Sequence, residues 1–340
     1  MKDKSLLRIG VIMISILISF NSFSQEKILS KKIVYEVKIM NSRIEQSVKK
    51  DSIVYDYLVD KRFWWQTIDT IISQVKSKKL YFKTSERENL VFDSIKKDLQ
   101  KKYLACFKDT LTDKKFQKLL EEEIRAIKFE EEWTYNPQTM LINKKVIGYN
   151  PIITRDSIML QDEDLVPKEF FRFELGWIYP SLKPELKDTL CVVRNIHFTM
   201  PIYNKTPYHW WDSHIEPEYS LTYFESYMQK AEQGQIKVYA QPNSTESYSR
   251  AEIIKRKQFE MMTTIDTQDI YGNDVPKDTI IKGNYNTDNL DYLRFGDEWY
   301  FDIPSSQFVK NVNYLSPMIQ IIGMDGGLRG LMPIYYLRRR

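Results

Sequence analysis

Two short stretches of the chain share one pattern, and they lie 166 positions apart, as Trp133 and Trp299 do. They are EEEWTYNP (130–137) and GDEWYFDI (296–303), and each places acidic residues before a tryptophan and an aromatic residue two positions after it. At this offset, residues 129–152 and 295–318 agree without a gap. The matching pairs are Phe129 with Phe295, Glu132 with Glu298, Trp133 with Trp299, Tyr135 with Phe301, Lys144 with Lys310, Val146 with Val312, and Pro151 with Pro317. This self-similarity predicts one module used twice.

The similarity extends on both sides of these stretches. Downstream, LGWIYPSL (175–182) is echoed by LMPIYYL (331–337). Upstream, apolar residues at helical spacing recur 156 positions later, first as Trp65, Ile68, Ile71, Ile72 and Val75 and then as Leu221, Phe224, Tyr227, Met228 and Ala231. Each of these helices leads into a short strand-like segment, 78–82 or 235–240. The alternative is a chance resemblance between amphipathic segments.

The same reading gives the remaining elements of each copy. A second helix is expected from Phe92, Ile95, Leu99, Tyr103 and Cys106 in the first copy, and from Ile253, Ile254 and Phe259 in the second. The alternation around the two tryptophans predicts strands, each followed by a turn and a partner strand that stops at Pro151 or Pro317. A further strand is expected within 170–179, and a long loop over 267–289. The predicted fold class is α+β, with two tandem copies of a helix–strand–helix–β-hairpin–strand module.

The organisation of the chain follows from these elements. We expect a signal peptide over 1–24, a lead-in segment over 25–49, a first module over 50–195, a connecting segment over 196–216 and a second module over 217–340. The three prolines of the connecting region, Pro201, Pro207 and Pro217, favour an extended conformation there.

The first residues have the pattern of an export signal. A charged start is followed by an almost wholly apolar run from Ile9 to Phe20, which is too short to span a bilayer comfortably. Small residues at Ser22 and Ser24 predict cleavage between Ser24 and Gln25 and an exported protein. An uncleaved N-terminal anchor is the alternative. No cysteine follows the run, which disfavours a lipid anchor.

Charge and cysteine content narrow the classes of function. The formal net charge is +4, and the expected signal peptide contributes about half of it, so there is no electrostatic case for nucleic-acid binding. The two cysteines, Cys106 and Cys191, do not make a disulfide framework. A bond between them and two separate thiols both remain open.

A search for catalytic or metal-binding patterns gives no candidate active site. His209, Asp212 and His214 could offer two imidazoles and a carboxylate to a metal, but a separation of five residues does not place both histidines on one helical face. The acidic runs 130–132 and 297–298 are interpreted as solubilising charges on edge strands rather than a general acid and base. With no phosphate loop or nucleophile motif, the prediction is a protein that is not an enzyme and carries no cofactor and no metal.

The order of the short motifs resembles the core of the GldN/PorN family, the gliding-motility and type IX secretion proteins of the bacterial periplasm. In the second copy the resemblance lies in SLTYFESYMQKAEQGQIKVYA (220–240) and DEWYFDIPSSQFVKNVNYLSPM (297–318). In the first it lies in RFWWQTID (62–69), EEWTYN (131–136), VIGYNPI (146–152) and LGWIYPSLKPEL (175–186). It covers most of 60–190 and 218–337. The family carries the core once, before a long charged C-terminal segment, whereas this chain repeats it. In the second copy, Pro333 replaces the tryptophan of the W-I-Y-P motif.

The resemblance implies a non-catalytic structural component of the secretion and gliding machinery. Its implied partners are a GldK-like outer-membrane lipoprotein and a GldM-like motor protein, in an oligomeric ring. Trp133, Tyr135, Trp299 and Phe301 are interpreted as repeated structural positions, and Trp177, Tyr179, Trp210 and Trp211 as interface residues. Two other hypotheses are a stand-alone exported module that binds a peptide or glycan, and an exported hydrolase, for which no nucleophile and base are found.

Overall fold

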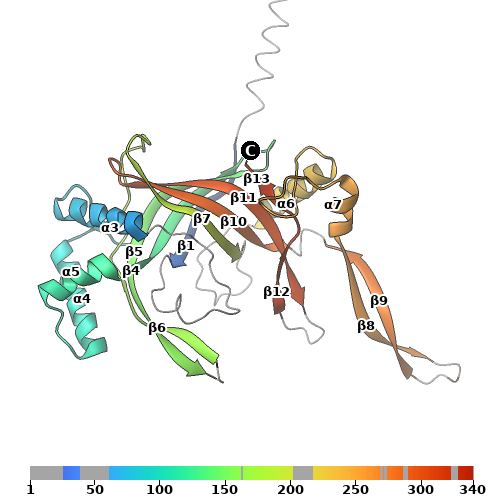
Figure 1. Cartoon of the computed structure of the whole chain (residues 1–340), viewed down its shortest axis with the longest axis horizontal. Helices are drawn as coiled ribbons and strands as arrows, with labels where there is room; N and C mark the ends of the chain where they lie inside the picture. Colours follow the sequence, from blue (N-terminus) through green and yellow to red (C-terminus); the bar gives the residue numbers. More distant parts are fainter. Residues whose placement is uncertain are drawn as a thin grey trace, which may run out of the picture.

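The computed structural model describes residues 26–38, 61–161, 164–201, 217–268, 271, 274–285, 290–322 and 328–339. In this part of the chain, helices pack on a large antiparallel sheet, so the fold class is α+β as predicted. Figure 1 shows helices α3 to α5 at one end of the molecule, with α6, α7 and a two-stranded arm at the other.

The main sheet has nine strands among the described residues. Six strands run in the order β1-β4-β5-β11-β10-β7, while β6 adds to β5, and β12 and β13 add to β11. The two halves of the sheet meet where β5 pairs with β11, at Lys144 and Lys310. The strand bounds are Lys27–Lys38 (β1), Ile124–Tyr135 (β4), Ile142–Gln161 (β5), Asp164–Glu174 (β6), Thr189–Pro201 (β7), Leu290–Asp302 (β10), Gln307–Ile322 (β11), Leu328–Pro333 (β12) and Leu337–Arg338 (β13).

The helices bury one face each and have local stop and start signals. On the apolar face of α3, the buried Trp64 donates its indole N–H to the Ile124 carbonyl at 3.0 Å. Ser249 and Glu252 form a capping box at the start of α7, and Gly234 follows α6 with φ of +70°. The helix bounds are Lys61–Lys76 (α3), Phe92–Phe107 (α4), Asp113–Glu122 (α5), Pro217–Glu232 (α6) and Arg250–Arg256 (α7).

Both hairpin strands run past the prolines at which they were expected to stop. β5 continues beyond Pro151, and β11 continues beyond Pro317. A proline breaks a ladder only where its missing N–H is needed. The carbonyls of Pro151 and Pro317 accept from the N–H groups of Leu175 and Ile334, at 3.1 Å in both cases, so each proline faces a short outer segment rather than the β4 or β10 ladder.

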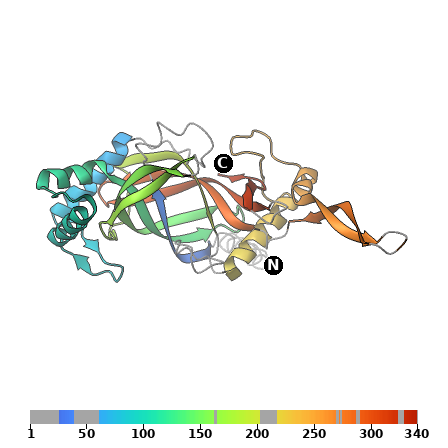
Figure 2. The ribbon, with the colours of Figure 1, turned by 90° about the horizontal axis from the view of Figure 1, so that it is seen from below.

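The expected long loop over 267–289 is wrong in its central part. β8 (Gln258–Gln268) pairs along its whole length with β9 (Asp274–Asn284) and forms a separate two-stranded sheet, which Figure 2 shows as a projecting arm. Val275, Thr279, Ile280 and Ile281 supply the β-branched residues that favour a strand among the polar ones. The strand-like segments expected at 78–82 and 235–240 are shorter than predicted, with Phe82–Lys83 (β2) pairing with Asn89–Leu90 (β3) and Tyr239 forming isolated bridges.

The sheet contains segments that lie across the expected boundaries. β1 falls within the expected lead-in 25–49 and pairs with β4, because its alternating apolar residues reach the core. β7 crosses position 195 and pairs with β10, so the first expected module ends inside a strand of the other half. No helix in the described ranges is long and apolar enough to cross a membrane. Cys106 lies on α4 and Cys191 on β7, and the structure does not join them.

Candidate functional site

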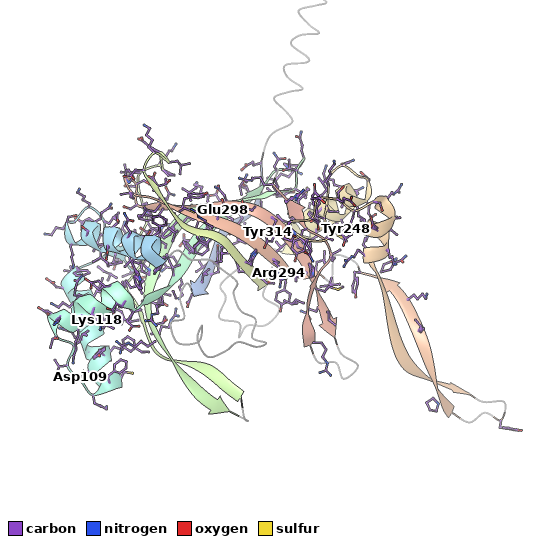
Figure 3. The ribbon with its side chains drawn as sticks, in the orientation of Figure 1. Asp109, Lys118, Tyr248, Arg294, Glu298 and Tyr314 are labelled. Atoms are coloured by element: carbon purple, nitrogen blue, oxygen red, sulfur yellow. The ribbon has the colours of Figure 1, made fainter. Side chains whose placement is uncertain are left out.

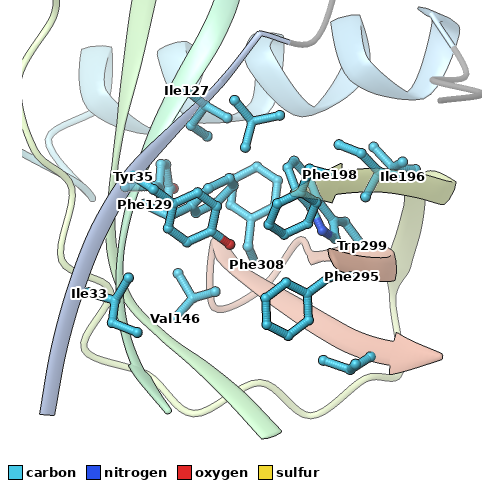
Figure 4. Packing of buried hydrophobic residues seen from close by; sticks show 14 of the residues in the cluster. Ile33, Tyr35, Ile127, Phe129, Val146, Ile196, Phe198, Phe295, Trp299 and Phe308 are labelled. Carbon is cyan, nitrogen blue, oxygen red and sulfur yellow. The ribbon is translucent and has the colours of Figure 1, made fainter. Parts of the chain in front are cut away.

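The two tryptophans of the repeat lie at the centre of the core, and each packs on a ring from the other half of the sheet. Trp133 and Trp299 are both fully buried. Trp133 meets Phe295 edge to face at 5.0 Å, and Trp299 meets Phe129 in the same way at 5.0 Å. Figure 4 shows three of these rings, Phe129, Phe295 and Trp299, converging from different strands. Because 129 and 295 differ by the repeat offset, the two contacts are reciprocal.

Two ion pairs cross the midline of the sheet in the same reciprocal way. Lys144 donates to Asp297 with 2.7 Å between Nζ and Oδ2, and Lys310 lies 2.6 Å from Glu131 Oε1. All four side chains are fully buried. Each ammonium also lies over aromatic rings, with Lys144 3.6 Å from the centroid of Phe295 and Lys310 3.1 Å from that of Phe129. Cation–π contact therefore replaces part of the lost hydration.

This placement corrects the interpretation of the two acidic runs. Glu131 and Asp297 are interior partners of lysines and not solubilising charges on edge strands. β4 and β10 are central strands with a neighbour on each side, so one residue in two along them faces the curled interior. The signal in the sequence was the repeat itself, which aligned Lys144 with Lys310 and so marked two lysines at corresponding positions.

The two ion pairs differ in how completely they are hydrogen-bonded. Glu131 also accepts from the Tyr35 hydroxyl at 3.0 Å and from Trp133 Nε1 at 2.7 Å. In the other pair, Asp297 Oδ1 and Trp299 Nε1 are buried and have no hydrogen-bond partner in the described part of the chain. Asp297 reaches less far than Glu131, because an aspartate side chain is one methylene shorter than a glutamate side chain. Tyr35 donates to Glu131, whereas Phe198, the ring stacked on Tyr35, has no hydroxyl that could donate to Asp297. The second pair is therefore the less satisfied copy.

Burial sets the titration behaviour of the cluster. Desolvation lowers the pKa of Lys310 to about 8 and also lowers the pKa of Lys144, against the pull of their carboxylates. Desolvation raises the pKa of Asp297, and it raises that of Tyr35 well above the ordinary value. Each group is thus shifted toward its neutral form, as expected when burial outweighs the neighbouring charge. The cluster is closed from solvent and organises the core.

Trp177 and Tyr179 lie instead on a half-exposed surface beside the helices. The backbone of Trp177 forms two hydrogen bonds with Lys83, at 2.7 and 2.8 Å, and that of Ile178 forms two with Tyr149. Ile178 and Phe82 face the core, so the neighbouring Trp177 and Tyr179 face outward. Lys83 lies opposite Trp177 in an antiparallel bridge, and the same register two residues further on places Tyr81 opposite Tyr179. Tyr81 is 43% exposed. We call Tyr81, Trp177 and Tyr179 the aromatic patch.

Polar contacts fix the geometry of this patch. The rings of Trp177 and Tyr179 stack at 6.1 Å, and the Arg87 guanidinium lies 4.6 Å from the Tyr179 centroid. The Tyr179 hydroxyl donates to Glu130 at 3.1 Å, and burial together with Glu130 raises the pKa of Tyr179 to about 12. Gly148 lies beneath the ring, where an added Cβ would come within 2.6 Å of it. The patch is a preorganised aromatic surface with a cation beside it, the 60% exposed Arg87, which also pairs with Glu130 at 3.4 Å.

The other predicted site residues have different outcomes. Tyr135 and Phe301 are buried, with Tyr135 packed edge to face on Tyr223 of α6. Trp210, Trp211, His209, Asp212 and His214 lie outside the described residues, as does the expected signal peptide. Among the residues that the structure describes, no group of three or more histidine, cysteine, aspartate or glutamate side chains could hold a metal ion.

Comparison with protein-family models, with curated proteins and with solved structures gives no match for this chain.

Proposed function

We propose that this chain is a non-catalytic periplasmic assembly component of the type IX secretion and gliding machinery, related to the GldN/PorN family through a duplicated core. The proposed partners are a GldK-like lipoprotein and a GldM-like motor protein. The sequence motifs that carry this resemblance lie on α3, β4, β5 and the 175–186 segment of one half, and on α6, β10 and β11 of the other.

The proposal includes a duplication of the core. Reciprocal contacts support it most strongly, because Lys144–Asp297 and Lys310–Glu131 exchange partners at the repeat offset of 166. The order β1-β4-β5-β11-β10-β7 reads the same from both ends if β1 corresponds to β7, β4 to β10 and β5 to β11. Exchanged identical contacts are typical of a two-fold interface. The repeated unit would then begin at β1 and β7 rather than at positions 50 and 217.

The aromatic patch is the surface proposed to bind the protein partner. Trp, Tyr and Arg are enriched at the energetic centres of protein interfaces, and Trp177, Tyr179 and Arg87 are already held in place before binding. Preorganisation lowers the entropic cost of association. The stacked pair equally supports the alternative, a stand-alone exported module that uses the same rings as a platform for a peptide or glycan.

Cross-linked affinity purification of the tagged chain from its own cell envelope tests the proposal. We expect mass spectrometry to recover the lipoprotein or the motor protein with wild type, and much less of either with a Trp177→Ala/Tyr179→Ala variant. Leu182→Ala, a substitution at an exposed residue after the patch, is the matched control and should behave as wild type does. Recovery of the chain alone would contradict an assembly role. Stabilisation of that monomer by a peptide or glycan would favour the alternative.

A further inference from the structure

The β8–β9 arm is the element that most clearly distinguishes the second half from the first. It is a two-stranded sheet that shares no ladder with the main sheet. At its base, the Tyr285 N–H donates to the Lys257 carbonyl at 2.6 Å, and among the described elements α7 is its main neighbour. Figures 1 and 2 show it reaching away from the body. An isolated two-stranded ribbon is marginally stable in water, which favours a role in contact with a partner.

The arm carries exposed apolar residues in a segment with an acidic sequence. Ile280 is 58% exposed and Tyr271 at the tip is 82% exposed. The register pairs Met262 with Ile280, and Asp278 lies two positions before Ile280 in β9. Residues 258–284 contain five acidic and two basic residues, a net charge of −3. The arm is therefore an acidic ribbon with an exposed apolar position.

The opposite end of the same molecule has the complementary character. From the start of α3 to the end of α5 the chain has fifteen basic and nine acidic residues, a net charge of +6. On α4, the exposed Lys97, Lys101 and Leu104 follow one another at helical spacing, with Leu104 51% exposed, and the exposed Lys108 caps the end of the helix. An exposed leucine between lysines matches an exposed isoleucine beside aspartate. Figure 3 labels Asp109 and Lys118 at this end, far from the arm.

We propose that the β8–β9 arm of one copy packs on the outer face of α4 of a second copy. The two surfaces lie at opposite ends of the long axis, so one molecule cannot satisfy its own arm. The contact is head to tail, and repeating it produces a ring if the rotation closes and a filament if it does not. This deepens the proposed assembly role and rests on it for its cellular setting, but the arm and α4 are both distinct from the aromatic patch.

A charge exchange on the full chain tests this contact. One variant carries Asp278→Lys and Ile280→Lys in the arm, and the other carries Lys101→Glu and Leu104→Glu on α4. We expect sedimentation velocity to show concentration-dependent assembly of wild type, weaker at high salt, and roughly tenfold weaker association of either variant alone. An equimolar mixture of the two variants should assemble again, because each basic surface then has an acidic one to meet.

The exposed Glu185 and Lys187 supply a matched control, since Glu185→Lys/Lys187→Glu reverses charges away from both surfaces and should assemble as wild type does. Wild type that stays monomeric, or variants that assemble unchanged, would overturn the proposal. Should the α4 variant fail to fold, the arm variant still tests it, because its substitutions lie outside the main sheet. Wild type that does not self-associate but still recovers the envelope partners would reject the arm contact alone. Self-association without those partners would reject the proposed function alone.

Discussion

At the scale of single residues, the core is organised by four buried charges rather than by apolar packing alone. Taking two lysines and two carboxylates out of water is costly, and the attraction within each pair offsets this only where the remaining donors and acceptors are satisfied. Lys310–Glu131 meets that condition better than Lys144–Asp297, since Tyr35 and Trp133 both donate to Glu131. We infer that the pairs contribute mainly to fixing how the two halves of the sheet align.

Removing one member of the better-satisfied pair should be strongly destabilising. Lys310→Met leaves Glu131 buried without its cation, and we expect the free energy of unfolding in urea to fall by about 3–5 kcal/mol. The double variant Lys310→Met/Glu131→Gln removes both charges and should recover part of that loss. A single variant as stable as wild type would show that the Lys310–Glu131 pair contributes no net stability.

The lowered pKa of Lys310 gives its stability effect a direction with pH. The pKa is about 8 in the folded chain and about 10.4 in an unfolded chain, so the unfolded state binds more protons between these values. The unfolding free energy therefore rises with pH in this window, by at most about 1.4 kcal/mol per unit. Above pH 10 the raised pKa of Tyr35 acts in the opposite direction. Between pH 8 and pH 9.5, wild type should gain stability relative to Lys310→Met, and an equal slope for the two would contradict the assignment.

The unsatisfied indole of Trp299 predicts a stabilising substitution. In Asp297→Glu the carboxylate can extend to Trp299 Nε1, as Glu131 does to Trp133, and one added buried hydrogen bond should stabilise by about 1 kcal/mol. Thermal unfolding should then shift upward by roughly 2–4 °C. Glu131→Asp is the mirror variant and should lose a comparable amount. A lower Tm for Asp297→Glu would mean that the site has no room for the extra methylene.

The sequence predicted some of these residues and not others, for identifiable reasons. Trp133 and Trp299 could be assigned to strands because aromatic and polar residues alternate around them. The role of Glu131 and Asp297 could not be assigned, since an acid within an acidic run looks the same whether it faces solvent or the interior. Only the pairing of β5 with β11 brings them to lysines from the other half.

At the scale of elements, periodic helices were predictable and the arm was not. The apolar spacing of α3, α4 and α6 is long and regular, so their existence could be predicted. The strand pair within 258–284 could not be recognised among its polar residues, because a solvent-exposed ribbon has no fully apolar face. The prediction that the strands end at the prolines was wrong for a related reason. Whether Pro151 ends a strand depends on which side of the ladder its nitrogen faces.

The close approach of Tyr179 to Gly148 gives an element-level test of the aromatic patch. In Gly148→Ala the new Cβ would lie 2.6 Å from the Tyr179 ring, so the ring must leave its place and lose its bond to Glu130. We expect urea unfolding to show a loss of about 1–3 kcal/mol, with weaker recovery of the envelope partner. Gly330→Ala, where nothing lies within 4 Å of the new Cβ, is the matched control. Full partner recovery with Gly148→Ala would argue against the patch.

The arm should be dispensable for folding. A variant that replaces 259–283 with two glycines keeps the Gln258–Asn284 register pair that closes the base. Since the arm forms no ladder with the main sheet, we expect the Tm to change by less than about 3 °C, while self-association is lost. Collapse of the thermal transition in this variant would show instead that the arm supports the body.

At the scale of the whole molecule, the α+β class could be predicted from the sequence, whereas the way the two halves of the sheet join could not. Motif order predicted two units side by side, each with its own hairpin. The structure instead places β5 and β11 as neighbours in one curled sheet, so that Tyr35 of β1 stacks on Phe198 of β7 at 5.7 Å. Pairing between strands so distant in sequence leaves no local pattern, and the exchanged ion pairs follow from it.

Both proposals rest on the two halves meeting at β5 and β11, and an engineered disulfide measures this directly. The bridge between Lys144 and Lys310 places Asn143 opposite Asn311, and residues directly opposite in antiparallel strands are about 4.5–5.5 Å apart at Cα, within disulfide range. In a chain with Cys106→Ser and Cys191→Ala, peptide mapping of Asn143→Cys/Asn311→Cys should find an intramolecular bond. Single variants provide the control and should form none within the chain. Two thiols that stay reduced under oxidation, or that bond only between chains, would contradict the joined sheet.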